Sequence, residues 1–218
     1  MPAADQRNTD PTQIHLQIGG RFRLSLFAGR SVLNSAAFLL GLGAAAAQVT
    51  ASSPDSQAHP TCTDLLQEQD AKAVAACKAQ LDEAESAPAS ELMARIVADD
   101  DYGVALLAVA HQPKKALAVF DREMALLPAS TVKPDSLQWA VAFWHRATAY
   151  QQLDQWAHAA SDLSTAEDTF TRAIATAAGD EARARHFTEL RQRVRAQHAN
   201  VLNRMGRHSE ALRILATQ

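Results

Sequence analysis

The chain has 218 residues, with 47% hydrophobic and 21% charged side chains and a formal net charge of −3. This length allows one domain with a buried core, and the composition excludes a disordered or fibrous protein. Aromatic residues make up only 6%, and alanine is abundant while β-branched residues are few, which favours helices over a β-sandwich or barrel. The slightly acidic balance also excludes the basic surface of a general nucleic-acid-binding protein.

The N-terminal segment has the pattern of a secretory signal peptide. Arg21, Arg23 and Arg30 precede an uncharged stretch, residues 31–47, which ends in the small side chains that a signal peptidase prefers. We expect cleavage after residue 47, so that residues 1–47 are the signal peptide and the mature protein is periplasmic or secreted, without a membrane attachment. The alternative is an uncleaved membrane anchor, for which the stretch is short and only moderately apolar.

The mature chain is predicted to contain a linker and one helical domain. Residues 48–60 are polar and without periodicity, as expected of a flexible linker, and residues 61–218 follow as the domain. In the domain, apolar residues recur at steps of three and four, which predicts amphipathic helices. The clearest series are Ala140, Phe143, Ala147 and Tyr150; then Trp156, Ala159, Leu163, Ala166 and Phe170; and then Phe187, Leu190, Val194, Val201 and Met205. We expect a turn at residues 153–155 and helix ends at Gly179 and Gly206.

Cys62 and Cys77 are the only two cysteines, and an oxidising compartment favours their pairing. One continuous helix would hold their Cα atoms about 22 Å apart, too far for a disulfide. Pairing therefore requires a chain reversal, which a short helical hairpin provides if Asp70 caps its second helix. The alternatives are two free buried thiols or a redox pair, although the Cys-x-x-Cys spacing is absent.

Three segments resemble the tetratricopeptide repeat: residues 116–128, 149–166 and 201–215. In that family, a small residue on each helix lets the two helices of a hairpin approach closely. The matching small residues here are Ala116, Ala147, Ala159, Ala199 and Ala211. The resemblance implies an all-α fold, a short α-solenoid of degenerate helical hairpins.

The spacing of the segments departs from a regular array. Ala159 follows Ala116 by 43 residues and Ala211 follows Ala159 by 52, whereas the family repeats about every 34. The larger excess corresponds to about five helical turns, so two overlong helices around Gly179 would still present the same face to the core. Arg146 and His198 also occupy positions where the family usually has an apolar residue.

Motifs of catalysis are absent from the sequence. There is no His-Glu-x-x-His, no phosphate-binding glycine loop and no Gly-x-Ser-x-Gly, so we expect no enzyme activity, no catalytic residues and no cofactor. The histidines do not stand in helical i, i+3 or i+4 pairs, and we expect no metal site. The run Asp99-Asp100-Asp101 lacks the alternating spacing of a calcium loop. We expect it to be a solvated, acidic helix boundary.

The two ends of the mature chain carry opposite charge. Residues 55–101 have eight more acidic than basic side chains, and residues 181–218 have five more basic than acidic ones, all of the basic ones being arginine. One reading is a solvated helix face. The other is a surface that attracts carboxylates, because the guanidinium group can pair with them through two hydrogen bonds.

These features favour a non-enzymatic protein-binding or scaffolding module of the cell envelope. The tetratricopeptide resemblance implies that the first helix of each hairpin lines the partner-binding surface. The candidate partner-binding residues on those helices are Trp144, Thr148, Gln151, Arg193, Asn200, Asn203 and Arg204. The partner would be a protein or peptide, with an ordinary solvated face as the competing interpretation. The alternative functions are a structural homo-oligomer formed through the C-terminal helix and an accessory domain of an envelope enzyme.

Overall fold

The computed structural model describes residues 60–88 and 91–216. Within these ranges the chain forms α-helices and one short 3-10 helix and contains no strand, which confirms the all-α prediction. The helices are α1 (Cys62–Gln67), α2 (Ala73–Ser86), α3 (Leu92–Ala108), α4 (Pro113–Leu126), η4 (Leu127–Ala129), α5 (Leu137–Gln152), α6 (Trp156–Thr176), α7 (Glu181–Arg204) and α8 (His208–Ala216). The predicted signal peptide, residues 1–47, and the linker up to residue 59 lie outside the described residues.

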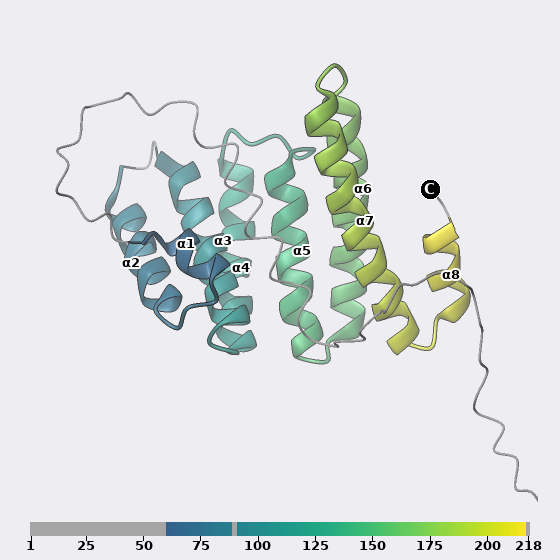
Figure 1. Cartoon of the computed structure of the whole chain (residues 1–218), viewed down its shortest axis with the longest axis horizontal. Helices are drawn as coiled ribbons and strands as arrows, with labels where there is room; N and C mark the ends of the chain where they lie inside the picture. The colour runs from purple at the N-terminus through teal and green to yellow at the C-terminus, as the bar shows by residue number, and fades with distance from the viewer. Residues whose placement is uncertain (1–59, 89–90, 217–218) are drawn as a thin grey trace, which may run out of the picture. The chain divides into compact units, whose positions relative to one another are not determined.

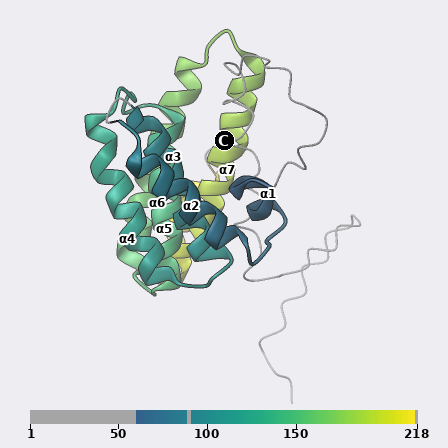
Figure 2. The ribbon, with the colours of Figure 1, turned by 90° about the vertical axis from the view of Figure 1, so that its left-hand side faces the viewer.

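Each helix packs mainly against the helices before and after it in the chain, as Figures 1 and 2 show. The pairs α1–α2, α3–α4, α5–α6 and α7–α8 are therefore helical hairpins. The first helices of the later hairpins also contact one another, since α5 touches both α3 and α7. α3 additionally contacts α1 and α2, so it is covered by helices on several sides. No helix in the described ranges has both the length and the apolar character needed to cross a bilayer.

The first hairpin carries the predicted disulfide. Cys62 and Cys77 are bonded, with their Cα atoms 4.7 Å apart, which confirms that the chain reverses direction between them. Asp70 assists the reversal, but not as the N-cap: its Oδ1 accepts a hydrogen bond from the backbone amide of Lys72 at 2.7 Å, and Lys72 itself occupies the N-cap position of α2. Both cysteines are buried, so the bond forms part of the core beneath α1 and α2.

The largest core cluster joins α5, α6, α7 and α8. Its small members are the alanines expected at close helix approaches, and Ala147, Ala159, Ala199 and Ala211 are all at most 2% exposed. Three phenylalanines, each at most 1% exposed, fill the larger spaces of the protein interior: Phe120, Phe170 and Phe187. The pairing of small and large residues lets neighbouring helices approach closely without leaving voids.

The helix ends lie at or near the turn and the glycines predicted from the sequence. α5 ends at Gln152 and α6 begins at Trp156, so the turn lies at residues 153–155. Gly206 has a φ of +76°, and the amides of Gly206 and Arg207 donate to the carbonyls of Asn203 and Leu202, which is the Schellman arrangement. Gly179, with a φ of +100°, separates the two longest helices, α6 with 21 residues and α7 with 24.

Candidate functional site

The polar residues predicted on the helix before Gly206 lie on one stripe of α7. Arg193, Asn200 and Arg204 are exposed, and their spacing of seven and four residues places them on the same side of the helix. Gln197 belongs to this stripe as well, because it lies four residues after Arg193. The stripe therefore presents two guanidinium groups and an amide together.

Gln197 attaches the stripe to α5. Its Oε1 accepts a hydrogen bond from the indole Nε1 of Trp144 at 2.6 Å, and its Nε2 donates to Oγ1 of Thr148 at 3.0 Å. Trp144 and Thr148 are each only 3% exposed, so these two candidate partner-binding residues are buried in the structure. The physical reason is that a large indole gains most from burial, provided that its N–H finds a partner.

The remaining predicted residues occupy different environments. Gln151 is half-buried and donates weakly to a backbone carbonyl one turn earlier, at 3.4 Å. The Oδ1 of Asn203 lies 3.1 Å from Nδ1 of His208 on α8. The guanidinium of Arg204 lies over the ring of Trp156, 5.9 Å from its centre. The predicted residues that the structure leaves exposed all lie on α7: Arg193, Asn200, Asn203 and Arg204.

A cluster of buried ionisable side chains lies where α2, α3, α4 and α5 meet, and the sequence did not predict it. Asp99, Asp100 and Asp101 are in the middle of α3, not at its boundary. Asp99 is fully buried and Asp100 is 8% exposed, so the expectation of a solvated acidic boundary is wrong. The cause is that α3 is surrounded by other helices, which cover a segment that would be exposed on a single hairpin.

Asp99 faces α4, where it pairs with the guanidinium of Arg122. The same guanidinium reaches back to Glu85 of α2, 3.0 Å away. Burial raises the pKa of Asp99, and the hydrogen bond and charge of Arg122 only partly offset this effect. Asp99 is therefore a buried acid that shares the guanidinium of Arg122 with Glu85.

Asp100 and Asp101 face other helices, because consecutive positions on a helix are rotated by about 100°. Oδ1 of Asp100 lies 2.6 Å from Nδ1 of His145 on α5. Oδ2 of Asp101 accepts a hydrogen bond from Nε2 of Gln80 on α2 at 3.3 Å. Burial, together with the charge of Asp100, raises the pKa of Asp101 to about 7. The three aspartates thus connect α3 to three different neighbours.

His145 and Glu123 complete the cluster from α5 and α4. Burial alone would lower the pKa of His145, but the charge and hydrogen bond of Asp100 raise it above its ordinary value. Glu123 is 2% exposed. Burial raises its pKa well above the ordinary value, and the charges of the three aspartates, led by Asp100, raise it further. Burial thus favours the neutral forms of Asp101 and Glu123, whereas the contact with Asp100 favours the charged form of His145.

Arg146 links this region to α6. It donates to both carboxylate oxygens of Asp162, at 2.7 and 2.9 Å, and to Asp121 of α4 at 3.2 Å. The hydrogen bond to Asp162 raises the pKa of Arg146. Arg146 thus forms one ion pair within the third hairpin and another to the second hairpin.

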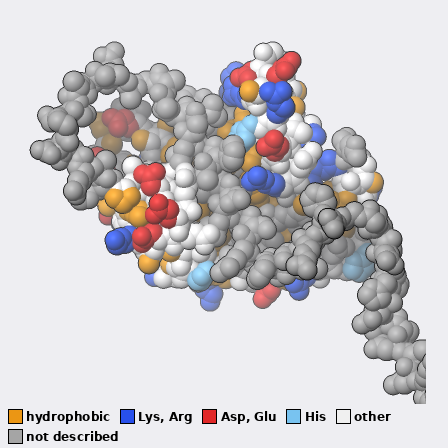
Figure 3. Space-filling view, viewed as in Figure 1, with side chains coloured by type: hydrophobic (Ala, Val, Ile, Leu, Met, Phe, Trp, Pro, Cys, Tyr) orange, Lys and Arg blue, Asp and Glu red, His pale blue; other side chains and the backbone are white. Residues whose placement is uncertain are grey.

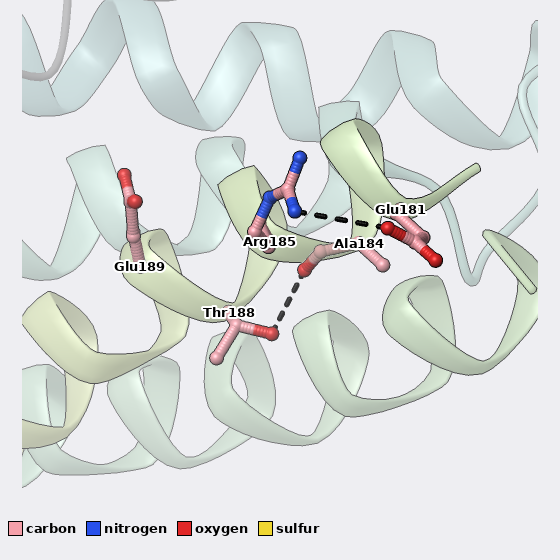
Figure 4. A pocket seen from close by; sticks show the side chains of 5 residues that line it. All are labelled: Glu181, Ala184, Arg185, Thr188 and Glu189. Atoms are coloured by element: carbon pink, nitrogen blue, oxygen red, sulfur yellow. Dashed lines mark hydrogen bonds and ion pairs between the residues drawn. The ribbon is translucent and has the colours of Figure 1, made fainter.

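A shallow surface depression lies at the beginning of α7 and contains none of the predicted residues. It is lined by Glu181, Ala184, Arg185, Thr188 and Glu189 (Figure 4). Arg185 pairs with Glu181 at 3.8 Å, and the hydroxyl of Thr188 donates to the backbone of Ala184 at 2.8 Å. Because one helix supplies all of its lining, the depression is an open surface feature and does not enclose a ligand.

Searches for metal-ligating groups and for related proteins gave no positive result. No group of three or more histidine, cysteine or acidic side chains in residues 60–88 and 91–216 is arranged to hold a metal ion. Comparison with protein families, curated proteins and solved structures found no match for the chain.

Proposed function

We propose that this chain is a non-enzymatic protein-binding or scaffolding module, a short α-solenoid of tetratricopeptide-like hairpins that presents α7 to a protein or peptide partner. The observation that carries the proposal is the stripe of exposed polar and basic side chains on α7, formed by Arg193, Asn200 and Arg204. Asn203 lies beside it, at the same end of the helix.

The stripe is held in a fixed position by contacts to its neighbours. Gln197, within the stripe, is hydrogen-bonded to two buried side chains of α5. On another side of α7, Arg195 forms an ion pair with Glu167 of α6 at 3.2 Å. A surface that is already ordered loses less conformational entropy when a partner binds. α7 is therefore better suited to recognition than an exposed loop would be.

The side chains of the stripe indicate the chemistry of the partner. A guanidinium group donates two parallel hydrogen bonds to a carboxylate, and an asparagine amide both donates to and accepts from a peptide backbone. We therefore expect a protein or peptide segment that carries acidic side chains or a free carboxyl group. Since binding would combine charge with backbone recognition, its affinity should fall as salt concentration rises.

The proposal is tested by capturing partners from the compartment in which the protein resides. The double variant Arg204→Ala/Asn200→Ala should recover much less of the partner than the wild type, by about tenfold for a loss of 1 to 2 kcal/mol. Arg185→Ala is the matched control, because Arg185 is an exposed arginine of the same helix outside the stripe. Equal recovery by all three proteins would contradict the proposal.

The proposal includes a periplasmic or secreted location. The buried disulfide between Cys62 and Cys77 supports it, because such bonds persist mainly in oxidising compartments. The N-terminal charge and hydrophobicity pattern supports it independently.

A structural homo-oligomer formed through α8 is the second candidate function. Leu212 and Leu215 are 69% and 54% exposed, and α8 packs mainly against α7, so these leucines face away from the core. Light scattering coupled to size exclusion separates a monomer from an oligomer. If α8 mediates assembly, Leu212→Gln should shift the protein towards the monomer, whereas Val97→Gln, at an exposed valine of α3, should not. A monomeric wild type at high concentration would contradict this candidate.

A further inference from the structure

The buried cluster contains polar atoms that no described residue satisfies. Oε2 of Glu123 and Oδ2 of Asp99 are buried without a hydrogen-bond partner, and so are the Nε atoms of Arg122 and Arg95. A carboxylate in this situation has lost its hydration and gained nothing equivalent. It is more stable with a proton attached, because the neutral form has much less hydration to lose.

Carboxyl groups also outnumber the cations around the cluster. The charged or titratable groups that face it come from five helices: Glu85 of α2; Arg95, Asp99, Asp100 and Asp101 of α3; Asp121, Arg122 and Glu123 of α4; His145 and Arg146 of α5; and Asp162 of α6. Seven of these groups are carboxyl groups and three are guanidinium groups.

The available cations are already used by other carboxylates. Arg122 forms ion pairs with Asp99 and Glu85. Arg146 forms ion pairs with Asp162 and Asp121. Among the described residues, Glu123 and Asp101 form no ion pair. Glu123 is therefore buried without a cation for a negative charge. Asp101 is partly buried and has only the hydrogen bond from Gln80.

We propose that Glu123 and Asp101 carry protons in the folded protein under mildly acidic conditions, and that the contact between the α3–α4 hairpin and α5 is proton-dependent and loosens when they ionise. The proposal does not depend on the binding function of α7, because the cluster lies in the first two hairpins and at their contact with α5.

The titration behaviour of the individual groups supports this assignment. Burial raises the pKa values of Glu123, Asp101 and Asp99, with that of Asp101 at about 7. The charge of Arg146 lowers the pKa of Glu123, but less than burial and the neighbouring aspartates raise it. An acid whose pKa is higher in the folded than in the unfolded state stabilises the fold less as pH rises. These three acids should therefore contribute less to the free energy of unfolding as pH rises above about 4, which is opposite to the effect of the carboxylates that cause ordinary acid denaturation.

The loss of stability at higher pH should be concentrated at the contact of α4 with α3 and α5. Phe120 of α4 is fully buried, touches Gly103 of α3 so closely that a Cβ atom there would collide with its ring, and lies 6.0 Å from the ring of His145. Ionised carboxyl groups in the interior between these helices require water, which can enter only if the helices separate. Such separation is local opening and need not unfold α6 to α8.

Amide hydrogen exchange measured at about pH 6 and pH 8.5 tests the proposal on the intact protein. After correction for the intrinsic pH dependence of exchange, amides of α3, α4 and α5 should open about tenfold more often at the higher pH, whereas those of α6 and α7 should change much less. Glu123→Gln and Asp101→Asn remove the charge while keeping the side-chain size, and each should reduce the difference between the two pH values. Glu83→Gln, at an exposed acid of α2, is the matched control and should behave like the wild type.

Two results would overturn the proposal. One is a wild-type protein whose corrected exchange in α3 to α5 is the same at both pH values, a result that needs no variant. The other is a Glu123→Gln protein and an Asp101→Asn protein that both retain the full wild-type pH response.

Discussion

Nδ1 of His145 on α5 lies 2.6 Å from Oδ1 of Asp100 on α3, although the two residues are 45 positions apart in the chain. Both side chains are buried. The contact joins the first helices of two successive hairpins, so it contributes to the packing between hairpins and not to the formation of either one. The imidazole needs the aspartate because a protonated histidine in the interior is otherwise unstable.

Breaking this pair should destabilise the protein in a pH-dependent manner. Asp100→Asn leaves the imidazole without its anion and should cost about 3 kcal/mol in the free energy of unfolding. The pKa of His145 is raised in the folded state, so its contribution is complete below about pH 6.5 and is lost as pH rises through the folded pKa. Urea unfolding should therefore show a larger loss at about pH 6 than at pH 8.5. An equal loss at both would mean that His145 is neutral throughout.

The disulfide should contribute substantially to stability. It closes a loop of 15 residues, for which the chain-entropy description gives about 3 kcal/mol. Cys62→Ala/Cys77→Ala should lower the free energy of unfolding by about 2 to 4 kcal/mol, as measured by urea denaturation. Maleimide labelling of the unreduced, denatured wild type is the companion measurement. Two reactive thiols per chain would show that the bond does not form in solution.

Ala159 and Ala211 are fully buried at helix contacts, and a larger side chain at either position should not fit. Ala159→Leu and Ala211→Leu are each expected to cost about 1 to 3 kcal/mol, because extra methyl groups force the two helices apart. Thermal unfolding measures the effect. Ala157→Leu, at an exposed alanine of α6, should change the melting temperature little. If Ala159→Leu melts at the same temperature as Ala157→Leu, the proposed close approach is wrong.

Export should leave a mature protein that begins near Gln48. Cleavage after Ala47 is the expected result, since the preceding run of small residues suits a signal peptidase. N-terminal sequencing of protein from the native host, combined with cell fractionation, tests both the start and the location. Recovery of an intact Met1 in the cytosol would contradict the expectation, and an intact N-terminus in the membrane fraction would identify an anchor instead.

The helices and their ends were predictable because their causes are local. The turn at residues 153–155 and the caps around Gly179 and Gly206 follow from apolar spacing and from the tolerance of glycine for positive φ. The cysteine pair was indicated by the expected oxidising compartment, and helix geometry added that the chain must reverse between the two residues. In each case the relevant residues are within about one or two helical turns of each other, or are joined by a single reversal.

The three aspartates of α3 show where this local reasoning fails. Consecutive carboxylates on a helix point in different directions, and the expectation of a solvated boundary treats each of these directions as solvent. Apolar neighbours at Ile96 and Val104 are the signal that the segment continues through the core. The partners Arg122 and His145 stand 23 and 45 residues away from Asp99 and Asp100, and no sequence pattern connects them.

The sequence by itself determined the helical class and several helix ends, and it indicated the disulfide and the polar residues of α7, because helical period, capping chemistry and chain length act over short distances. Only the tertiary structure decided what covers each helix. It buries Trp144 against α7 through Gln197, and it places the acids of α3 and α4 in the interior. The physical reason is that burial depends on which helices come to lie side by side, and the free energy of a charge or an indole is set by those neighbours rather than by its own segment.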